Sequence, residues 1–210
     1  MGVGETSATA FSVPETSLTF WEKRLLGAGI PVEHEDPRFG DAVLTFVDPD
    51  GMHLELIGHE MADAARAPRT SNVPAEHSIR GFFGVTLCEA GFEGTAAVLE
   101  KMGLVKAAEE GNRYRFSAPG GALGSHIDVR VQPQLVYGHM GAGSVHHIAF
   151  RAPDDPTQRD WREEMKSLRL DVTPVLDRTY FHSIYFREPG GVLFEIVGAR
   201  YLEMLDQPVA

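Results

Sequence analysis

Apolar residues near the start of the chain recur with the spacing of one face of a helix. The helix is expected to begin at Pro14, because a proline lacks the N–H that the first turn of a helix leaves unpaired. Leu18, Trp21 and Leu25 then fall on one face, and Gly27 is expected to end the helix. This stretch is therefore predicted to cover a sheet with one apolar face.

The next stretch changes from helical spacing to the shorter period of strands. Val43–Val47 is an apolar run rich in β-formers, Asp48–Gly51 has turn chemistry, and Leu54–Ile57 follows as a second strand. With an opening strand before Pro14 and a strand in the linker after the helix, the unit has the order βαβββ.

The same unit recurs later in the chain. A shift of 140 residues carries Trp21–Gly58 onto Trp161–Gly198 without a gap, and eight positions are identical. Upstream, Ala10, Phe11 and Pro14 match Ala149, Phe150 and Pro153 after a one-residue slip. Such self-similarity indicates repeated structural modules. The eight identities are Trp21/Trp161, Val32/Val172, Arg38/Arg178, Phe46/Phe186, Pro49/Pro189, Gly51/Gly191, Glu55/Glu195 and Gly58/Gly198.

A more diverged copy lies between these two. Gly81–Leu87 is expected to be its first strand, Glu93–Met102 its helix, Pro119–Gly121 its turn and His126–Val131 its last strand. The predicted fold class is α+β, built from three βαβββ modules whose curved mixed sheets form a metal-binding cleft. The expected boundaries are 5–58, 79–133 and 145–198 for the modules, 59–78 for a linker, 134–144 for a hinge and 199–210 for a tail.

Composition narrows the range of partners. The chain has 210 residues, of which 43% are hydrophobic, and it carries a net charge of -11. That charge disfavours nucleic acid and anionic membrane surfaces, and no apolar run approaches the ~20 residues that cross a bilayer. The single cysteine, Cys88, cannot form an internal disulfide, which fits a cytoplasmic protein. A small-molecule partner is therefore expected.

A histidine and a carboxylate stand out in the last module. Val145–Phe150 opens the module with two histidines, and Val192–Val197 closes it with Glu195 inside an apolar strand. A carboxylate there is costly to desolvate unless it is paired or bound to a metal. Neighbouring strands could bring His147 and Glu195 to one point.

Plainer interpretations remain open for the same residues. Glu195 could face solvent from an edge strand. It could also be a retained feature of the repeat, because Glu55 occupies the same position in the first module, where Ala8 replaces the histidine and no complete site follows. Neighbouring strand residues point to opposite faces, so the two adjacent histidines are not expected to bind one ion together. His147 is the predicted ligand, since it aligns with Ala8 and Phe83.

Imidazole nitrogen with carboxylate oxygen suits Fe(II), Mn(II), Zn(II) or Ni(II), and two histidines with one carboxylate form the facial triad of non-haem iron oxygenases. Only two of those three ligands are visible in the pattern.

Two segments of the last module resemble a known family. Gly143–Arg151 and Asp177–Ile196 are similar to the metal-binding strands of ring-cleaving dioxygenases that act on hydroquinone-type or catechol-type aromatics. These enzymes belong to the vicinal oxygen chelate superfamily, which includes the glyoxalase and bleomycin resistance proteins. The resemblance covers nearly the whole chain and is strongest from 140 to 200.

The resemblance implies an enzyme that uses Fe(II) and O2, with His147 and Glu195 as metal ligands. It also implies catalytic pocket roles for His146, Arg178 and Tyr185 around the substrate. Arg178 could equally form a structural ion pair, because Arg38 is its repeat counterpart, and Tyr185 could simply fill the sheet face.

The chain departs from the family in one respect. Such proteins normally carry four modules, and this sequence begins with what resembles the second, so the histidine of the first is not in a matching position. A homodimer in which the last module pairs with its twin would supply two histidines and two glutamates. A glyoxalase-like lyase or isomerase using Zn(II) or Ni(II), and a non-catalytic small-molecule-binding protein, are the alternative functions.

Overall fold

A computed structural model describes residues 2–64, 67, 72–121 and 123–198. The predicted tail, 199–210, lies outside the described residues. The N-terminal unit has the order strand, helix and three strands, and its elements are β1 (Glu5–Val13), α1 (Leu18–Gly27), β2 (Val32–Arg38), β3 (Asp41–Val47) and β4 (His53–Gly58).

Two further units repeat this order. The middle unit contains β5 (Gly81–Glu89), α3 (Glu93–Lys101), β6 (Val105–Glu110), β7 (Arg113–Ser117) and β8 (His126–Val131). The C-terminal unit contains β9 (Ile148–Arg151), α4 (Asp155–Ser167), β10 (Leu176–Asp177), β11 (His182–Arg187) and β12 (Leu193–Val197). Helix α2 (Glu60–Ala64) and a 3-10 turn (Ala75–His77) lie between the first two units.

The strands assemble into two sheets. One has eight strands in the order β2-β3-β4-β1-β5-β8-β7-β6, and the other has four in the order β10-β11-β12-β9. In every unit the first strand runs parallel to the last, and the units of the larger sheet join through antiparallel β1 and β5, with Thr9 opposite Val85. The predicted α+β class with βαβββ modules is confirmed.

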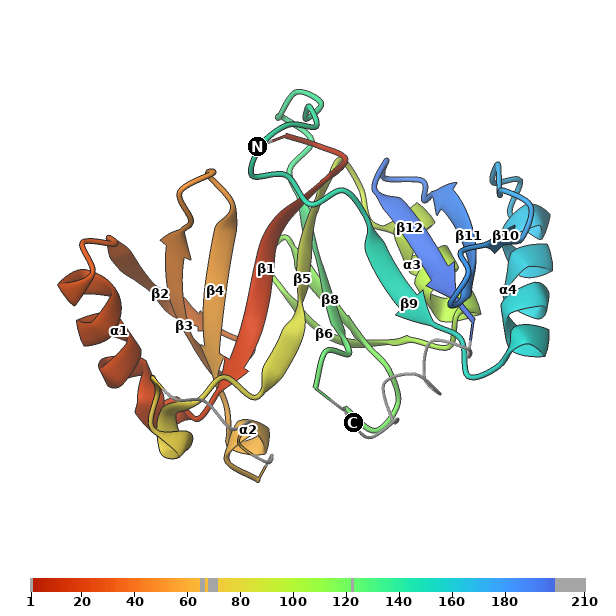
Figure 1. Ribbon diagram of the computed structural model, residues 1–210. Helices are drawn as coiled ribbons and strands as arrows, with labels where there is room; N and C mark the ends of the chain where they lie inside the picture. The colour runs from red at the N-terminus through yellow and green to blue at the C-terminus, as the bar shows by residue number, and fades with distance from the viewer. Residues whose placement is uncertain (1, 65–66, 68–71, 122, 199–210) are drawn as a thin grey trace.

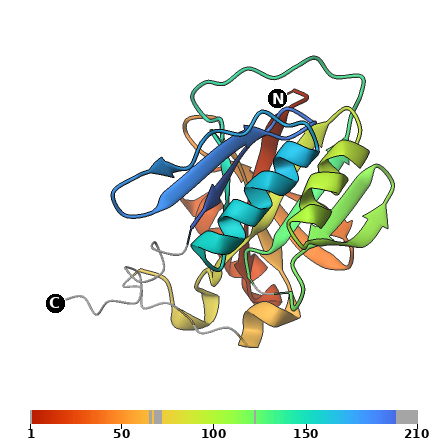
Figure 2. The same cartoon turned by 90° about the vertical axis from the view of Figure 1, so that its right-hand side faces the viewer.

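The two sheets stand side by side as the walls of an arch (Figure 1). Helices α3 and α4 run next to each other between the walls (Figure 2). They share one apolar core that includes Leu99, Met165 and Phe194, all fully buried. The C-terminal unit is therefore held to the middle unit by its helix face, which leaves the opposite face of the four-stranded sheet free of that core.

Two buried carboxyl groups join the middle and C-terminal units. Glu89, at the end of β5, and Glu188, in the turn after β11, both lie within 2.6 Å of the Thr95 hydroxyl of α3. One hydroxyl can donate only one hydrogen, so one carboxyl must be protonated and donate to Thr95. Glu188 also accepts the backbone N–H groups of Gly190 and Val192. Burial, followed by the charge of Glu188, raises the pKa of Glu89 to about 8, which makes Glu89 the group that holds the proton.

This joint predicts how stability depends on pH. Because the folded-state pKa of Glu89 lies above its ordinary value of 4.5, the folded state binds the proton more tightly, and stability falls as pH rises from about 4.5 to about 8. Glu89→Gln keeps the neutral form at every pH, so the variant should be more stable than the parent at pH 8, by on the order of 4 kcal/mol. Urea unfolding at pH 5 to 9 measures this, with Glu100→Gln, an exposed position on the helix α3 that carries Thr95, as control. Parallel pH profiles for parent and Glu89→Gln would contradict a buried proton.

Candidate metal centre

The open face of the four-stranded sheet carries the predicted histidine and carboxylate together. Ile184 and Phe194 point into the core shared with α4, so alternation places Glu195 and Tyr185 on the opposite face. Glu195 pairs with Ala149 of the neighbouring strand β9, and His147 lies two residues before that position. The His147 Nε2 and Glu195 Oε2 atoms are 2.8 Å apart.

Glu195 is buried and its second oxygen is held by hydroxyl groups. The Glu195 side chain is 6% exposed, whereas the His147 side chain is 33% exposed. The Ser183 hydroxyl and the Tyr185 hydroxyl both donate to Oε1 at 2.5 Å. Within the described residues no lysine or arginine forms an ion pair with Glu195. The carboxylate is thus fixed through Oε1, while Oε2 faces an imidazole.

The other two units neutralise the corresponding carboxylates internally. Sheet register makes Glu55 and Asp128 the counterparts of Glu195, since they pair with Ala10 and Thr86 as Glu195 pairs with Ala149. Arg38 Nη1 lies 2.7 Å from Glu55, and Arg115 Nε lies 2.8 Å from Asp128. A guanidinium therefore supplies the positive charge in those units, whereas among the residues that the structure describes Glu195 has no such partner.

The same register corrects one predicted alignment. Counting two residues back from the paired position gives Ala8 and Gly84 as the counterparts of His147, so Phe83 is one residue out of step. A Cβ atom at Gly84 would lie 2.1 Å from the carbonyl oxygen of His126, so no larger side chain fits there. The eight-stranded sheet offers no imidazole at either counterpart position.

The expectation that the two adjacent histidines point to opposite faces is wrong. Strand β9 begins only at Ile148, so the strict alternation of a strand does not apply to His146 and His147. Their Nδ1 atoms are 2.9 Å apart and the rings meet edge to face. His146 is exposed and hydrogen-bonds His147 on the side away from Glu195.

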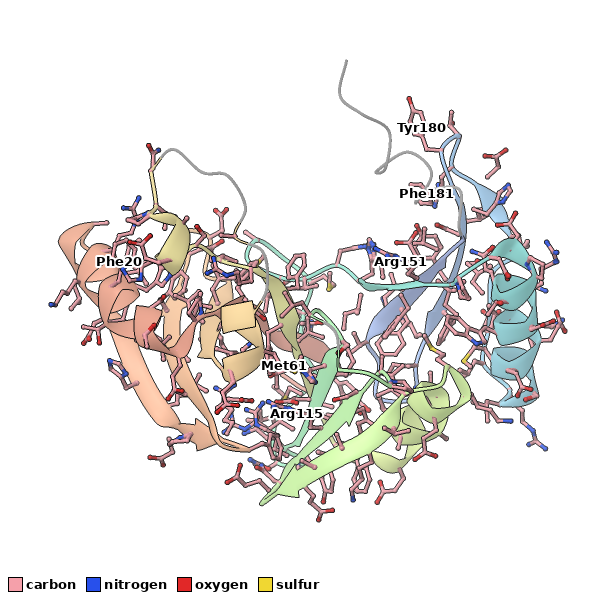
Figure 3. The ribbon with its side chains drawn as sticks, turned by 90° about the horizontal axis from the view of Figure 1, so that it is seen from below. Phe20, Met61, Arg115, Arg151, Tyr180 and Phe181 are labelled. Carbon is pink, nitrogen blue, oxygen red and sulfur yellow. The ribbon has the colours of Figure 1, made fainter. Side chains whose placement is uncertain are left out.

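Arg178 and Tyr185 extend this group of side chains. The exposed Arg178 guanidinium carbon lies 5.4 Å from the centre of the Tyr185 ring, and the Tyr185 ring meets His147 edge to face. Burial, then the hydrogen bond with Glu195, raises the pKa of the Tyr185 phenol. Arg178 thus stands over the tyrosine, unlike its repeat counterpart Arg38, which binds its glutamate directly. Tyr180 and Phe181 lie in the turn between β10 and β11 at the tip of the sheet (Figure 3).

The donor pair fits a divalent transition metal. Two ligands at ~2.1 Å from one ion and at right angles to each other are about 3 Å apart, close to the observed separation of Nε2 and Oε2. In the part of the chain that the structure describes, no group of three or more His, Cys, Asp or Glu side chains is placed to hold a metal. The pair can therefore supply two ligands of a larger set.

Sequence reasoning missed Ser183, although a signal was present. Ser183 lies two residues before Tyr185 on β11, so both face Glu195 on the neighbouring strand β12. Its counterpart in the first repeat is Val43, so a polar residue replaces an apolar one at a buried strand position next to the glutamate.

Comparison with known proteins places the chain in a family. The family model of the Glyoxalase/Bleomycin resistance protein/Dioxygenase superfamily matches residues 11–196. The chain belongs to this superfamily. Within it, 42% identity over 93% of this chain relates it to a protein of Bacillus subtilis (strain 168) named "Putative ring-cleaving dioxygenase MhqO", of which 62% is covered.

Two further comparisons agree with that placement. The chain is 30% identical to the chlorohydroquinone/hydroquinone 1,2-dioxygenase of Sphingobium indicum over 92% of this chain and 62% of that protein. Glyoxalase I from Zea mays shares the fold, with a TM-score of 0.67 at 15% identity over 98% of this chain and 70% of that chain. The chain spans less than two thirds of the length of MhqO and of the hydroquinone dioxygenase.

None of the described helices is long and apolar enough to cross a membrane.

Proposed function

We propose that His147 Nε2 and Glu195 Oε2 bind a divalent metal, and that the chain contributes this metal pair to the ring cleavage of hydroquinone-type or catechol-type aromatics by O2. The observation that carries the proposal is a buried carboxylate that faces an imidazole at 2.8 Å and has hydroxyl partners in place of the guanidinium found in the other two units. The names of the relatives supply the reaction class.

Fe(II) is the proposed metal, and Mn(II), Zn(II) and Ni(II) also suit an imidazole and a carboxylate. Bound iron would supply the path by which electrons pass between a deprotonated diphenol and O2. A protein with this activity would take part in the breakdown of aromatic compounds. The cytoplasmic location expected from Cys88 stays a prediction.

The remaining side chains would bind the substrate and handle its protons. Arg178, exposed above Tyr185, would attract the negative charge of an ionised diphenol. His146, exposed beside His147, would accept a proton from the incoming hydroxyl group. Tyr185 would hold Glu195 with its hydroxyl and present its ring edge to the substrate.

Substrate turnover tests the reaction class. Protein loaded anaerobically with Fe(II) should consume O2 when hydroquinone is added, with one O2 used for each ring opened, and should not isomerise the hemithioacetal of methylglyoxal. Hemithioacetal turnover with Zn(II) or Ni(II), or tight hydroquinone binding without O2 uptake, would overturn the proposed reaction.

We further propose that a second copy of the chain completes the site. Among the described strands, β9 forms one edge of the four-stranded sheet, whereas its counterparts β1 and β5 pair with each other. Antiparallel pairing of two β9 strands across a two-fold axis would bring His147 and Glu195 of both copies together. Gel filtration with metal analysis should find a dimer whose metal content tracks dimerisation. A monomer that binds no metal would contradict this proposal.

A further inference from the structure

The Glu195 carboxylate accepts hydrogen bonds from two hydroxyl groups that differ in how deeply they are buried. The Tyr185 side chain is only half-buried and its ring contacts His147, so a substrate can reach it. Ser183 is fully buried, with its backbone between β10 on one side and β12 on the other. Ser183 can therefore act on a bound metal or substrate only through the side chains it contacts, and its hydroxyl donates to Glu195.

The contact of Ser183 decides which carboxylate oxygen is free. Its hydroxyl donates to Oε1 at 2.5 Å, while Oε2 is 2.8 Å from His147 Nε2. A carboxylate whose one oxygen accepts two hydroxyl hydrogens has little freedom to rotate about its last side-chain bond. Oε2 is thus presented to the imidazole before any ion arrives.

The internal repeat shows what replaces this arrangement. In the first unit the counterpart of Ser183 is the buried Val43, which has no hydroxyl, and Glu55 turns to the Arg38 guanidinium instead. The serine occurs in the unit whose carboxylate has no guanidinium partner among the described residues. The serine hydroxyl and the arginine guanidinium are therefore alternative partners of the glutamate on the last strand of the unit.

We infer that Ser183 is a positioning residue that fixes Glu195 through Oε1, so that Oε2 binds the metal beside His147. This inference rests on the proposed function and names a residue beyond the family resemblance. Partners that orient a ligand typically change metal affinity by about 10- to 100-fold when they are removed. Ser183 is expected to act in that range.

The test measures metal affinity on the full chain. Competition with a chelating indicator gives the Kd for Zn(II), and the visible spectrum of Co(II) reports the ligand geometry. Ser183→Ala removes the hydroxyl. Ser183→Thr and Ser183→Val form a pair of equal size that differs only in the hydroxyl, and the Val43 counterpart shows that a β-branched residue is compatible with this strand position. Ser12→Ala, which removes an equally buried strand hydroxyl far from the site, is the matched control.

The expected result is a Kd for Zn(II) that rises about 10- to 100-fold in Ser183→Ala and Ser183→Val, together with a changed Co(II) spectrum. Ser183→Thr should bind nearly as the parent does, and Ser12→Ala should bind unchanged.

The outcomes separate the inference from the proposed function. A parent protein that binds Zn(II), with Ser183→Ala equally tight, would overturn the inference and leave the metal pair standing. Equal losses in the Thr and Val variants would also overturn it, because size and not the hydroxyl would then matter. A parent protein that binds neither ion would overturn the proposed function and this inference together.

Discussion

Glu195→Gln should weaken binding of divalent cations by more than about 100-fold, because it removes a charged ligand and not merely a group that orients one. The amide can still accept hydrogen bonds from Ser183 and Tyr185 through its oxygen. Burying a neutral amide costs less than burying a carboxylate, so the metal-free variant should be at least as stable as the parent. Metal affinity and metal-free stability are therefore expected to move in opposite directions.

The repeat offers a matched control for this prediction. Glu55→Gln makes the same change at the corresponding position of the first unit, where Arg38 already supplies the positive charge. Its affinity for Zn(II) should equal that of the parent, and its stability should fall because Arg38 loses its charged partner. Equal affinity of Glu195→Gln and the parent would remove Glu195 from the metal site.

Arg38→Met should lower the free energy of unfolding by about 3–5 kcal/mol, the usual cost of leaving one member of a buried ion pair alone. Arg38 and Glu55 are 7% and 5% exposed, so water cannot replace the lost guanidinium. The double variant Arg38→Met/Glu55→Leu removes both charges and should recover most of the loss, since apolar replacement of a buried pair is often neutral. Urea unfolding of the three proteins measures this.

Glu35 provides the comparison for surface charge. It contacts the same guanidinium but its side chain is 45% exposed, so Glu35→Gln should change stability by less than about 1 kcal/mol. A similar loss in Glu35→Gln and Arg38→Met would contradict the distinction between the buried and the exposed partner of Arg38.

Most of the fold could be predicted from the internal repeat of the sequence. Residues Trp21 and Trp161 mark equivalent helices, and the Glu55 and Glu195 positions recur on equivalent last strands. Turn chemistry at Asp48–Gly51 and its counterpart places the last strand antiparallel to the strand before it. Because a shared spacing of apolar residues implies a shared packing problem, the βαβββ order could be predicted without side-chain detail.

The details of the site could not be predicted in the same way. The strand alternation rule failed at His146 and His147 because β9 starts one residue later, at Ile148. Phe83 was aligned in place of Gly84 because the middle copy has diverged, and only the pairing of Thr86 with Asp128 fixes the register.

The different partners of Glu55 and Glu195 also lie beyond the sequence pattern. Arg38 and Arg178 occupy the same repeat position, yet Arg38 contacts its glutamate and Arg178 lies over Tyr185. The difference depends on what faces each carboxylate from β3 or β11, where Val43 corresponds to Ser183. Side-chain contacts of this kind depend on three strands at once, and a repeat comparison treats one position at a time.

His147 and Glu195 are proposed to bind one metal ion together. Crystals grown with Fe(II) under anaerobic conditions, measured at the iron absorption edge, test it most directly. We expect an anomalous peak about 2.0–2.2 Å from both His147 Nε2 and Glu195 Oε2, with Oε1 still bound to Ser183. An iron peak elsewhere, or none while His147 Nε2 remains hydrogen-bonded to Glu195, would contradict it.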